Sequence, residues 1–190
     1  MSISLLLTIA VSCGGGVCDC HPSAPESKDF RHGEKHVALP ESVPTETSVA
    51  QMLTWPPGPD PQDDTPRTGR ELTLYHIATA FLQNARLISF DCDMHLEVSE
   101  TPSKSAPRVI VETPIDHEYC ASREKLEAAL LKHHFRLRYV SNAEVSQSEL
   151  RPPLPVSVLG LAFRDFEHNR GSEEVASFWE LHPAEVTVKP

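Results

Sequence analysis

The last two thirds of the chain consist of short stretches in which apolar and polar residues alternate at every second position. Around residue 96, three apolar side chains alternate with His95 and Glu97, which is the two-residue period of a β-strand. Similar stretches predict strands over residues 72–88, 94–99, 108–112, 156–163 and 178–188, with an additional short strand at 135–140. Residues 122–133 instead repeat their apolar positions at helical spacing, and Ser122 is a candidate N-cap.

The order is therefore strand, strand, strand, helix, strand, strand. This is the order of the OB-fold, a five-stranded Greek-key barrel with a helix between its third and fourth strands. An α+β sandwich with the helix on one face is the alternative. Residues 141–155, which contain a proline cluster, are expected to form a loop. We predict a mainly β protein with one helix, built as an OB-fold-like barrel and preceded by a disordered N-terminal tail.

Residues 14–70 have a different composition. Nine of the 17 prolines lie between Cys13 and Arg70, and the apolar residues there are sparse and aperiodic. Burial of so few apolar side chains does not offset the entropy lost on ordering the chain. The predicted organisation is a signal or lipobox-like segment at 1–13, a disordered Pro-rich linker at 14–70 and an OB-like domain at 71–190.

The first residues form an apolar run that is too short to span a bilayer, for which roughly 20 residues are needed, but that suits the core of a signal peptide. Ala10-Val11-Ser12-Cys13 resembles the bacterial lipobox, in which small residues precede a cysteine that is lipidated. A plain cleaved signal or a buried N-terminal strand are the alternatives, and no Lys or Arg precedes the run. The resemblance implies export, a membrane anchor at Cys13 and a partner or small ligand at the cell envelope.

The formal net charge of −10 argues against one class of partner. An acidic surface repels a phosphate backbone, so we expect no nucleic-acid binding.

The cysteines give two smaller predictions. Cys18-Asp19-Cys20-His21 lacks the second ligand pair of a structural zinc site, so a local disulfide is the simpler interpretation. Cys92 and Cys120 are expected to form a disulfide in an oxidising compartment. Two buried thiols, or a catalytic Cys120 beside His117, are the alternatives.

Histidines and carboxylates recur on the predicted strands and are ligands for zinc or manganese. The candidate ligands are Asp93, His95, Asp165, His168, Glu180 and His182. Asp91 and Glu112 are candidates for an outer partner of a ligand, or for a general base. A network that only stabilises the strand ends would use the same side chains.

Four blocks together resemble a recurring pattern of uncharacterised exported bacterial OB-like domains. They are Asp91-x-Asp93-x-His95-Leu96, Ile110-x-Glu112-x-Pro114, Gly160-x-x-Phe163-x-Asp165-x-x-His168 and Trp179-Glu180-Leu181-His182-Pro183. The resemblance covers roughly residues 71–188 and implies no established activity. Asp91-Cys92-Asp93 is also faintly similar to the Asp-Gly-Asp motif of staphylococcal-nuclease-like OB domains, with a cysteine in place of the glycine.

The leading functional hypothesis is an exported, envelope-associated OB-like binding module, with a divalent metal as a candidate ligand. The alternative is a metal-dependent, nuclease-like hydrolase that uses His95, Asp165, His168 and His182. A metal-sensing or metal-carrying lipoprotein is a third hypothesis.

Overall fold

The structure is a computed structural model that describes residues 30–88, 91–140, 142–166 and 171–190. Its helices are α1 (His32–Lys35), α2 (Val49–Met52) and α3 (Cys120–Lys132), with 3-10 turns η1 (Gly69–Leu72), η2 (His117–Tyr119) and η3 (Asn142–Ser148). Its strands are β1 (Thr45–Thr47), β2 (Leu74–Leu87), β3 (Met94–Ser99), β4 (Arg108–Thr113), β5 (Glu149–Arg164) and β6 (Trp179–Val188). None of the helices in these ranges is long and apolar enough to cross a membrane.

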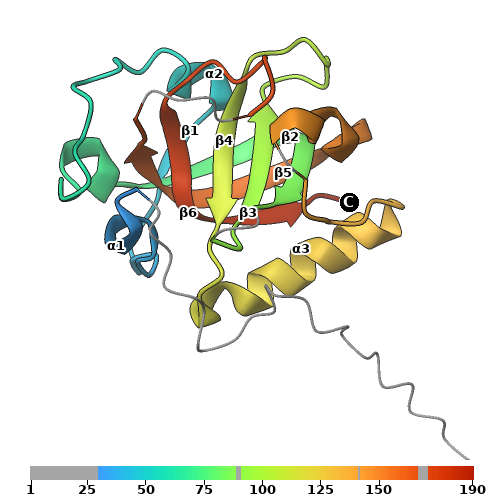
Figure 1. The fold of residues 1–190 in the computed structure, drawn as a ribbon, viewed down its shortest axis with the longest axis horizontal. Helices are drawn as coiled ribbons and strands as arrows, with labels where there is room; N and C mark the ends of the chain where they lie inside the picture. Colours follow the sequence, from blue (N-terminus) through green and yellow to red (C-terminus); the bar gives the residue numbers. More distant parts are fainter. Residues whose placement is uncertain (1–29, 89–90, 141, 167–170) are drawn as a thin grey trace, which may run out of the picture.

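The main strands close into a five-stranded barrel (Figure 1). The strand order is β2-β3-β4-β6-β5, and β5 returns to pair with β2. All of these pairings are antiparallel except that of β4 with β6. With α3 between β4 and β5, this confirms the predicted OB-fold-like barrel.

The barrel closes through β2, because this strand pairs with both β3 and β5. Residues 74–84 of β2 pair with β5, and residues 81–87 pair with β3. The register shifts between Leu82 and Asn84 in both pairings, as expected for a β-bulge that bends a strand. In the neighbouring strand β5, a Cβ added at Gly160 would lie 2.7 Å from the Ala184 Cβ of β6, so this close approach requires glycine.

The apolar positions of the alternating strands form one hydrophobic core. Met94, Leu96 and Val98 of β3 belong to it, together with Leu126 and Leu130 of α3. The helix begins at Cys120, two residues before the predicted cap, and Ser122 Oγ donates to the Tyr119 carbonyl at 2.9 Å instead of capping the helix. The predicted N-cap is therefore wrong, although the helix is present.

Residues 30–70 require a correction, because much of the predicted linker packs against the barrel. Val49 and Met52 of α2 are fully buried in the core, and the Trp55 ring lies 5.8 Å from that of Trp179. The buried guanidinium of Arg31 makes a bidentate contact with Glu71, at 2.8 and 3.2 Å. A few apolar side chains are enough to order residues 30–70, because they pack on a surface that the barrel already provides. The predicted signal or lipobox-like segment at 1–13 and residues 14–29 of the predicted linker lie outside the described residues.

Two smaller predictions also change. β5 begins at Glu149, so the proline cluster expected in a loop lies within a 16-residue strand. The predicted strand at 135–140 contributes only an isolated bridge between Leu87 and Tyr139.

Candidate metal centre

A layer of buried polar side chains lies on the outer face of the barrel wall. Residues that alternate with the core positions of β3, β4 and β6 point away from the core, as strand geometry requires. They are nevertheless almost completely buried: His95, Glu97, Glu112, Glu180 and His182. The sequence predicted which residues share a strand face. It did not predict that this outer face would be covered.

Two segments form the cover. Residues 31–37, which include α1, lie along one side, and the backbone around Ser172 lies along another. Arg67 connects the first segment to the barrel by hydrogen bonds. Its guanidinium donates to the Glu34 carbonyl of that segment and to the carbonyls of Ala162 in β5 and His182 in β6. Burial lowers the pKa of Arg67 to about 10, because its charge is removed from water.

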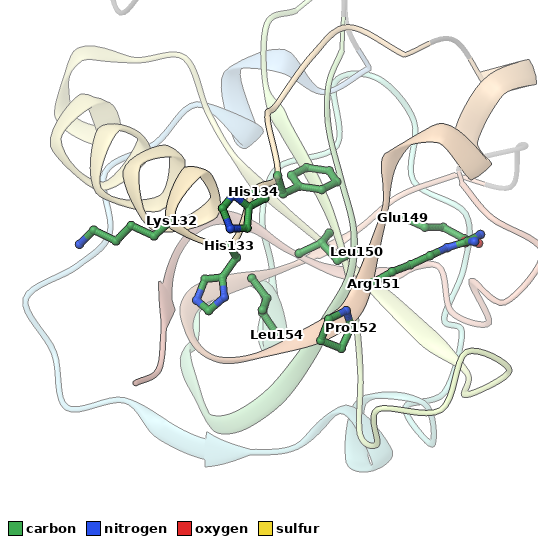
Figure 2. Close-up of a pocket in the computed structure, with 9 residues that line it drawn as sticks. Lys132, His133, His134, Glu149, Leu150, Arg151, Pro152 and Leu154 are labelled. Atoms are coloured by element: carbon green, nitrogen blue, oxygen red, sulfur yellow. The ribbon is translucent and has the colours of Figure 1, made fainter.

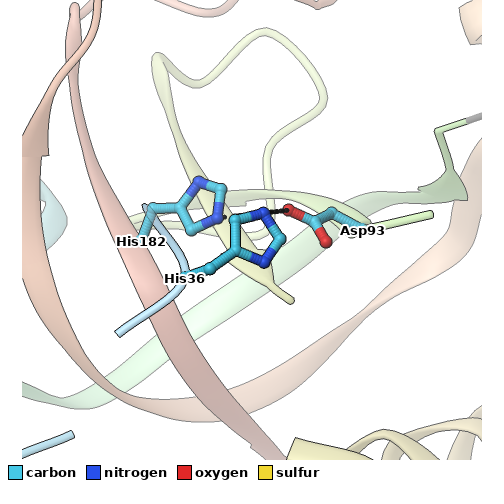
Figure 3. A group of neighbouring side chains, drawn as sticks. All are labelled: His36, Asp93 and His182. Atoms are coloured by element: carbon cyan, nitrogen blue, oxygen red, sulfur yellow. Dashed lines mark ion pairs between the residues drawn. The ribbon is translucent and has the colours of Figure 1, made fainter. Parts of the chain in front are cut away.

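Three ligand atoms converge beneath the cover: Nε2 of His36, Oδ2 of Asp93 and Nε2 of His182 (Figure 3). Asp93 Oδ2 lies 3.2 Å from His182 Nε2 and 3.8 Å from His36 Nε2. Zinc–ligand bonds of roughly 2.0–2.2 Å in a tetrahedron place ligand atoms about 3.3–3.6 Å apart, so the two separations bracket the value for a shared ion.

None of these three buried atoms makes a well-aligned hydrogen bond. Buried polar atoms are nearly always satisfied, because an unsatisfied one costs roughly 1–3 kcal/mol. All three atoms are of types that ligate a divalent cation, and they lie around one point, so a shared cation would satisfy them together.

The protein holds the other polar atom of two of these residues. His36 Nδ1 contacts Asp116 Oδ2 at 2.5 Å, and Asp93 Oδ1 accepts the Ile115 N–H at 3.0 Å. His182 Nδ1 lies 3.0 Å from Glu112 Oε2 without a well-aligned hydrogen bond. Metal-binding histidines commonly use the second ring nitrogen as His36 does, which fixes the ring orientation.

The charges of the layer also favour a cation. Burial alone lowers the pKa of His182, but contacts with Asp93, Glu112 and Glu180 outweigh it and raise that pKa well above its usual value. Burial raises the pKa of Glu112, but hydrogen bonds from His182 and His95 hold it well below its usual value. Without a metal, protonated histidines supply the positive charge that the carboxylates require.

Glu112, Glu180 and His182 Nδ1 form a second set of neighbouring ligand atoms. In this set Glu112 already uses one oxygen, because His95 Nδ1 contacts its Oε1 at 2.6 Å. The second set also shares His182 with the first. We therefore assign Glu112 and Glu180 to the outer contacts of His182.

Glu97 belongs to a neighbouring network in which its carboxylate is satisfied by protein groups alone. Its carboxylate contacts Arg86 Nη1 at 3.1 Å and Arg108 Nη1 at 2.9 Å, and accepts the Ser172 Oγ–H at 2.7 Å. Burial raises the pKa of Glu97, but its contact with His95 and its hydrogen bonds from Ser172 hold it far below its usual value. This half of the polar layer matches the alternative prediction of a stabilising network.

The predicted ligands are divided by the fold. Asp93 and Glu180 lie on opposite ring nitrogens of His182, with Glu112 beside Glu180, whereas His95 contacts Glu112 and is in neither set. Asp165 lies at the end of β5, where its carboxylate accepts the Phe166 N–H at 2.9 Å, and is in neither set.

The remaining predicted residues have other positions. Asp91 accepts the Asp93 N–H at 3.0 Å and so shapes the turn that presents Asp93. Cys92 and Cys120 are each disulfide-bonded, while their pairing with each other stays a prediction. His168 and Cys13 lie outside the described residues.

Sequence reasoning missed His36, which lies in the predicted linker. The available signal was the spacing of His32 and His36, four residues apart within a segment otherwise poor in ordered-structure signals. An i,i+4 pair of histidines lies on one face of a helix and is a common arrangement for metal ligands.

Two cavities formed by described residues lie away from these three side chains. One of about 630 Å³ is formed where α3 ends and β5 begins, with His133, Phe135 and Arg151 in its lining (Figure 2). Another of about 280 Å³ is lined by residues that include Pro44 and His76. Neither is lined by the three convergent residues, so neither offers a substrate a route to them.

Comparisons with protein-family models, curated proteins and solved structures find no match to this chain. The assignment of the site therefore depends on its geometry alone.

Proposed function

We propose that this protein is an exported, envelope-associated OB-like module that binds one divalent metal ion through His36, Asp93 and His182. The observation that carries the proposal is the convergence of three buried ligand atoms without aligned hydrogen bonds, two of them on side chains that the protein holds at their other polar atom. The barrel supplies two ligands and the N-terminal cover supplies the third.

The ligand chemistry indicates the class of metal. Two imidazoles and one carboxylate suit zinc or manganese, whereas the absence of a thiolate from the three disfavours a soft ion such as Cu(I). When bound, the ion would neutralise Asp93 and hold the two imidazoles in their neutral form.

We infer metal retention rather than hydrolysis as the role of the site. A hydrolytic centre needs an open position beside the ion for water and substrate. Three protein ligands leave a fourth position, which keeps the hydrolase as the second candidate. However, the Asp93 and His182 side chains are fully buried, and the two described cavities lie elsewhere.

Export is supported by the cysteines. Both Cys92 and Cys120 are disulfide-bonded, and disulfides persist mainly in oxidising compartments. A lipid on Cys13 would attach the protein to a membrane. Its partner there is proposed to be an envelope protein or a small ligand, and not nucleic acid. Cell fractionation tests this, because a soluble cytosolic full-length protein would contradict export and anchoring.

The metal is tested with the full chain, since His36 lies outside the barrel. We expect chelator-treated protein to take up one equivalent of Zn²⁺ or Mn²⁺ in a calorimetric titration. Metal at 100 times its dissociation constant adds about 2.7 kcal/mol of stability, which is a rise in melting temperature of roughly 5–10 °C for a chain of this size.

The variants His36→Ala and His182→Ala should abolish this uptake. His76→Ala is the matched control, because His76 is a partly exposed histidine of β2 that pairs with Glu46 and is in neither set of convergent ligand atoms. Wild-type protein that binds neither ion would contradict the proposal. Unchanged uptake by both ligand variants would show that the ligands were wrongly assigned. Metal-dependent cleavage of a phosphodiester or peptide substrate would favour the hydrolase.

A further inference from the structure

The proposed ion has to pass the cover, and a second histidine packs against His36 there. His32 and His36 are four residues apart, at the start of α1 and just beyond its end. Their rings are in contact, with centroids 4.0 Å apart and planes tilted by 41°. His32 is partly buried and precedes His36 along the same segment of the cover.

Among the three proposed ligands, His36 is closest to solvent. Its side chain is 7% exposed, whereas those of Asp93 and His182 are 0% exposed. The ring extends from the outer edge of the cover, where Nδ1 meets the 29%-exposed side chain of Asp116, to the convergence point at Nε2. An ion therefore reaches the buried ligands past the ring of His36.

His32 and Asp116 both contact His36. The His32 ring centroid lies 4.0 Å from that of His36, and Asp116 Oδ2 lies 2.5 Å from His36 Nδ1. An imidazole and a carboxylate therefore adjoin the most exposed of the three proposed ligands. They are the same two ligand types as in the buried site.

We infer that His32, beside Asp116, is a transfer ligand that receives a divalent cation from solvent and passes it, along the His36 ring, to the buried site. This inference rests on the proposed function. His32 is in neither set of mutually close ligand atoms, so it does not belong to the resting coordination shell. Its role is to speed exchange between solvent and the buried ligands.

A transfer ligand has a thermodynamic signature. A residue that contacts the ion only on the path lowers the barrier in both directions, so the association and dissociation rate constants change by the same factor. Their ratio, the equilibrium affinity, stays constant. A residue that binds the resting ion, or merely positions His36, changes the affinity instead.

The experiment uses the full-length protein and Zn²⁺ alone. Association is followed by stopped-flow competition with a chromophoric zinc indicator, and dissociation by mixing the loaded protein with excess chelator. In His32→Ala we expect both rates to fall several-fold by the same factor, with an unchanged dissociation constant. His32→Phe keeps a ring against His36 but has no ligand atom, so it should be equally slow.

Each outcome is decisive. His76→Ala, the control, should exchange at the wild-type rate. Wild-type rates in both His32 variants, or a weaker affinity without matched rate changes, would overturn the transfer role. If His32→Phe restores the rates lost in His32→Ala, the ring acts by packing and the inference is wrong. Failure of the wild-type protein to bind Zn²⁺ would instead refute the proposed function.

Discussion

Glu97→Gln tests whether the polar layer consists of two parts with different roles. The glutamine has nearly the same shape but lacks the charge that Glu97 provides to Arg86 and Arg108. All three side chains are essentially buried, with guanidinium-to-carboxylate distances of 3.1 and 2.9 Å. Removing one partner of a buried ion pair costs about 3–5 kcal/mol, because the remaining charges are left uncompensated.

For a chain of this size, each kcal/mol lowers the melting temperature by roughly 2–4 °C, so the expected loss is about 6–20 °C. Differential scanning calorimetry of metal-free protein measures it. The control is Glu149→Gln, which breaks the pair of Glu149 with Arg151, whose side chain is 65% exposed. Surface pairs of this kind contribute about 0–1 kcal/mol.

The same variant separates stability from metal binding. Glu97 is not among the convergent ligands, so Glu97→Gln should still bind one equivalent of metal at a temperature where it is folded. A melting temperature equal to that of Glu149→Gln would refute the view that the Glu97 pairs stabilise the fold. Loss of metal uptake in folded protein would refute the division into two parts.

Three further results are expected. Gly160→Ala should lower the free energy of unfolding in urea by about 1–3 kcal/mol, because the new methyl would meet the Ala184 Cβ at 2.7 Å; unchanged stability would contradict this close approach. The folded-state pKa of Glu97 is lowered, so its contribution to stability is present above the unfolded value of about 4.5 and is lost as the pH falls towards the folded pKa. Urea titrations between pH 3 and 7 should show this acid loss in wild type and a smaller one in Glu97→Gln. Glu112→Gln should weaken metal affinity about 10–100-fold in competition titrations, because it removes the carboxylate charge beside His182 Nδ1. An unchanged affinity would show that the His182 ring needs no carboxylate partner.

The strands, the single helix and their order could be predicted because each leaves a local signal. The alternation around His95 specifies a strand whatever surrounds it, and the observed β3 has the predicted bounds, Met94–Ser99. The pairs His95–Glu97 and Glu180–His182 were placed on common faces for the same reason. The order of these elements then favoured the barrel, and the pairing of β2 with β5 confirmed it.

The cover could not be predicted, because its stability comes from contacts between distant parts of the chain. Arg31 and Glu71 are 40 residues apart, and Arg67 reaches the carbonyl of His182 over 115 residues. A composition rich in proline indicates disorder when judged alone. It gives no information about a surface that exists only after the barrel has closed.

The sequence by itself determined the strand faces and the kinds of ligand they carry, since a two-residue period is a property of the local backbone. Only the tertiary structure decided which ligands meet. It brought Asp93 Oδ2 within 3.2 Å of His182 Nε2 and added His36 from the N-terminal segment. It placed His95 against Glu112, away from these three side chains. It also buried the outer face of the wall, and burial is what makes the unpaired ligand atoms costly without a cation. Strand periodicity acts within a few residues, whereas a metal centre requires three side chains at one point in space.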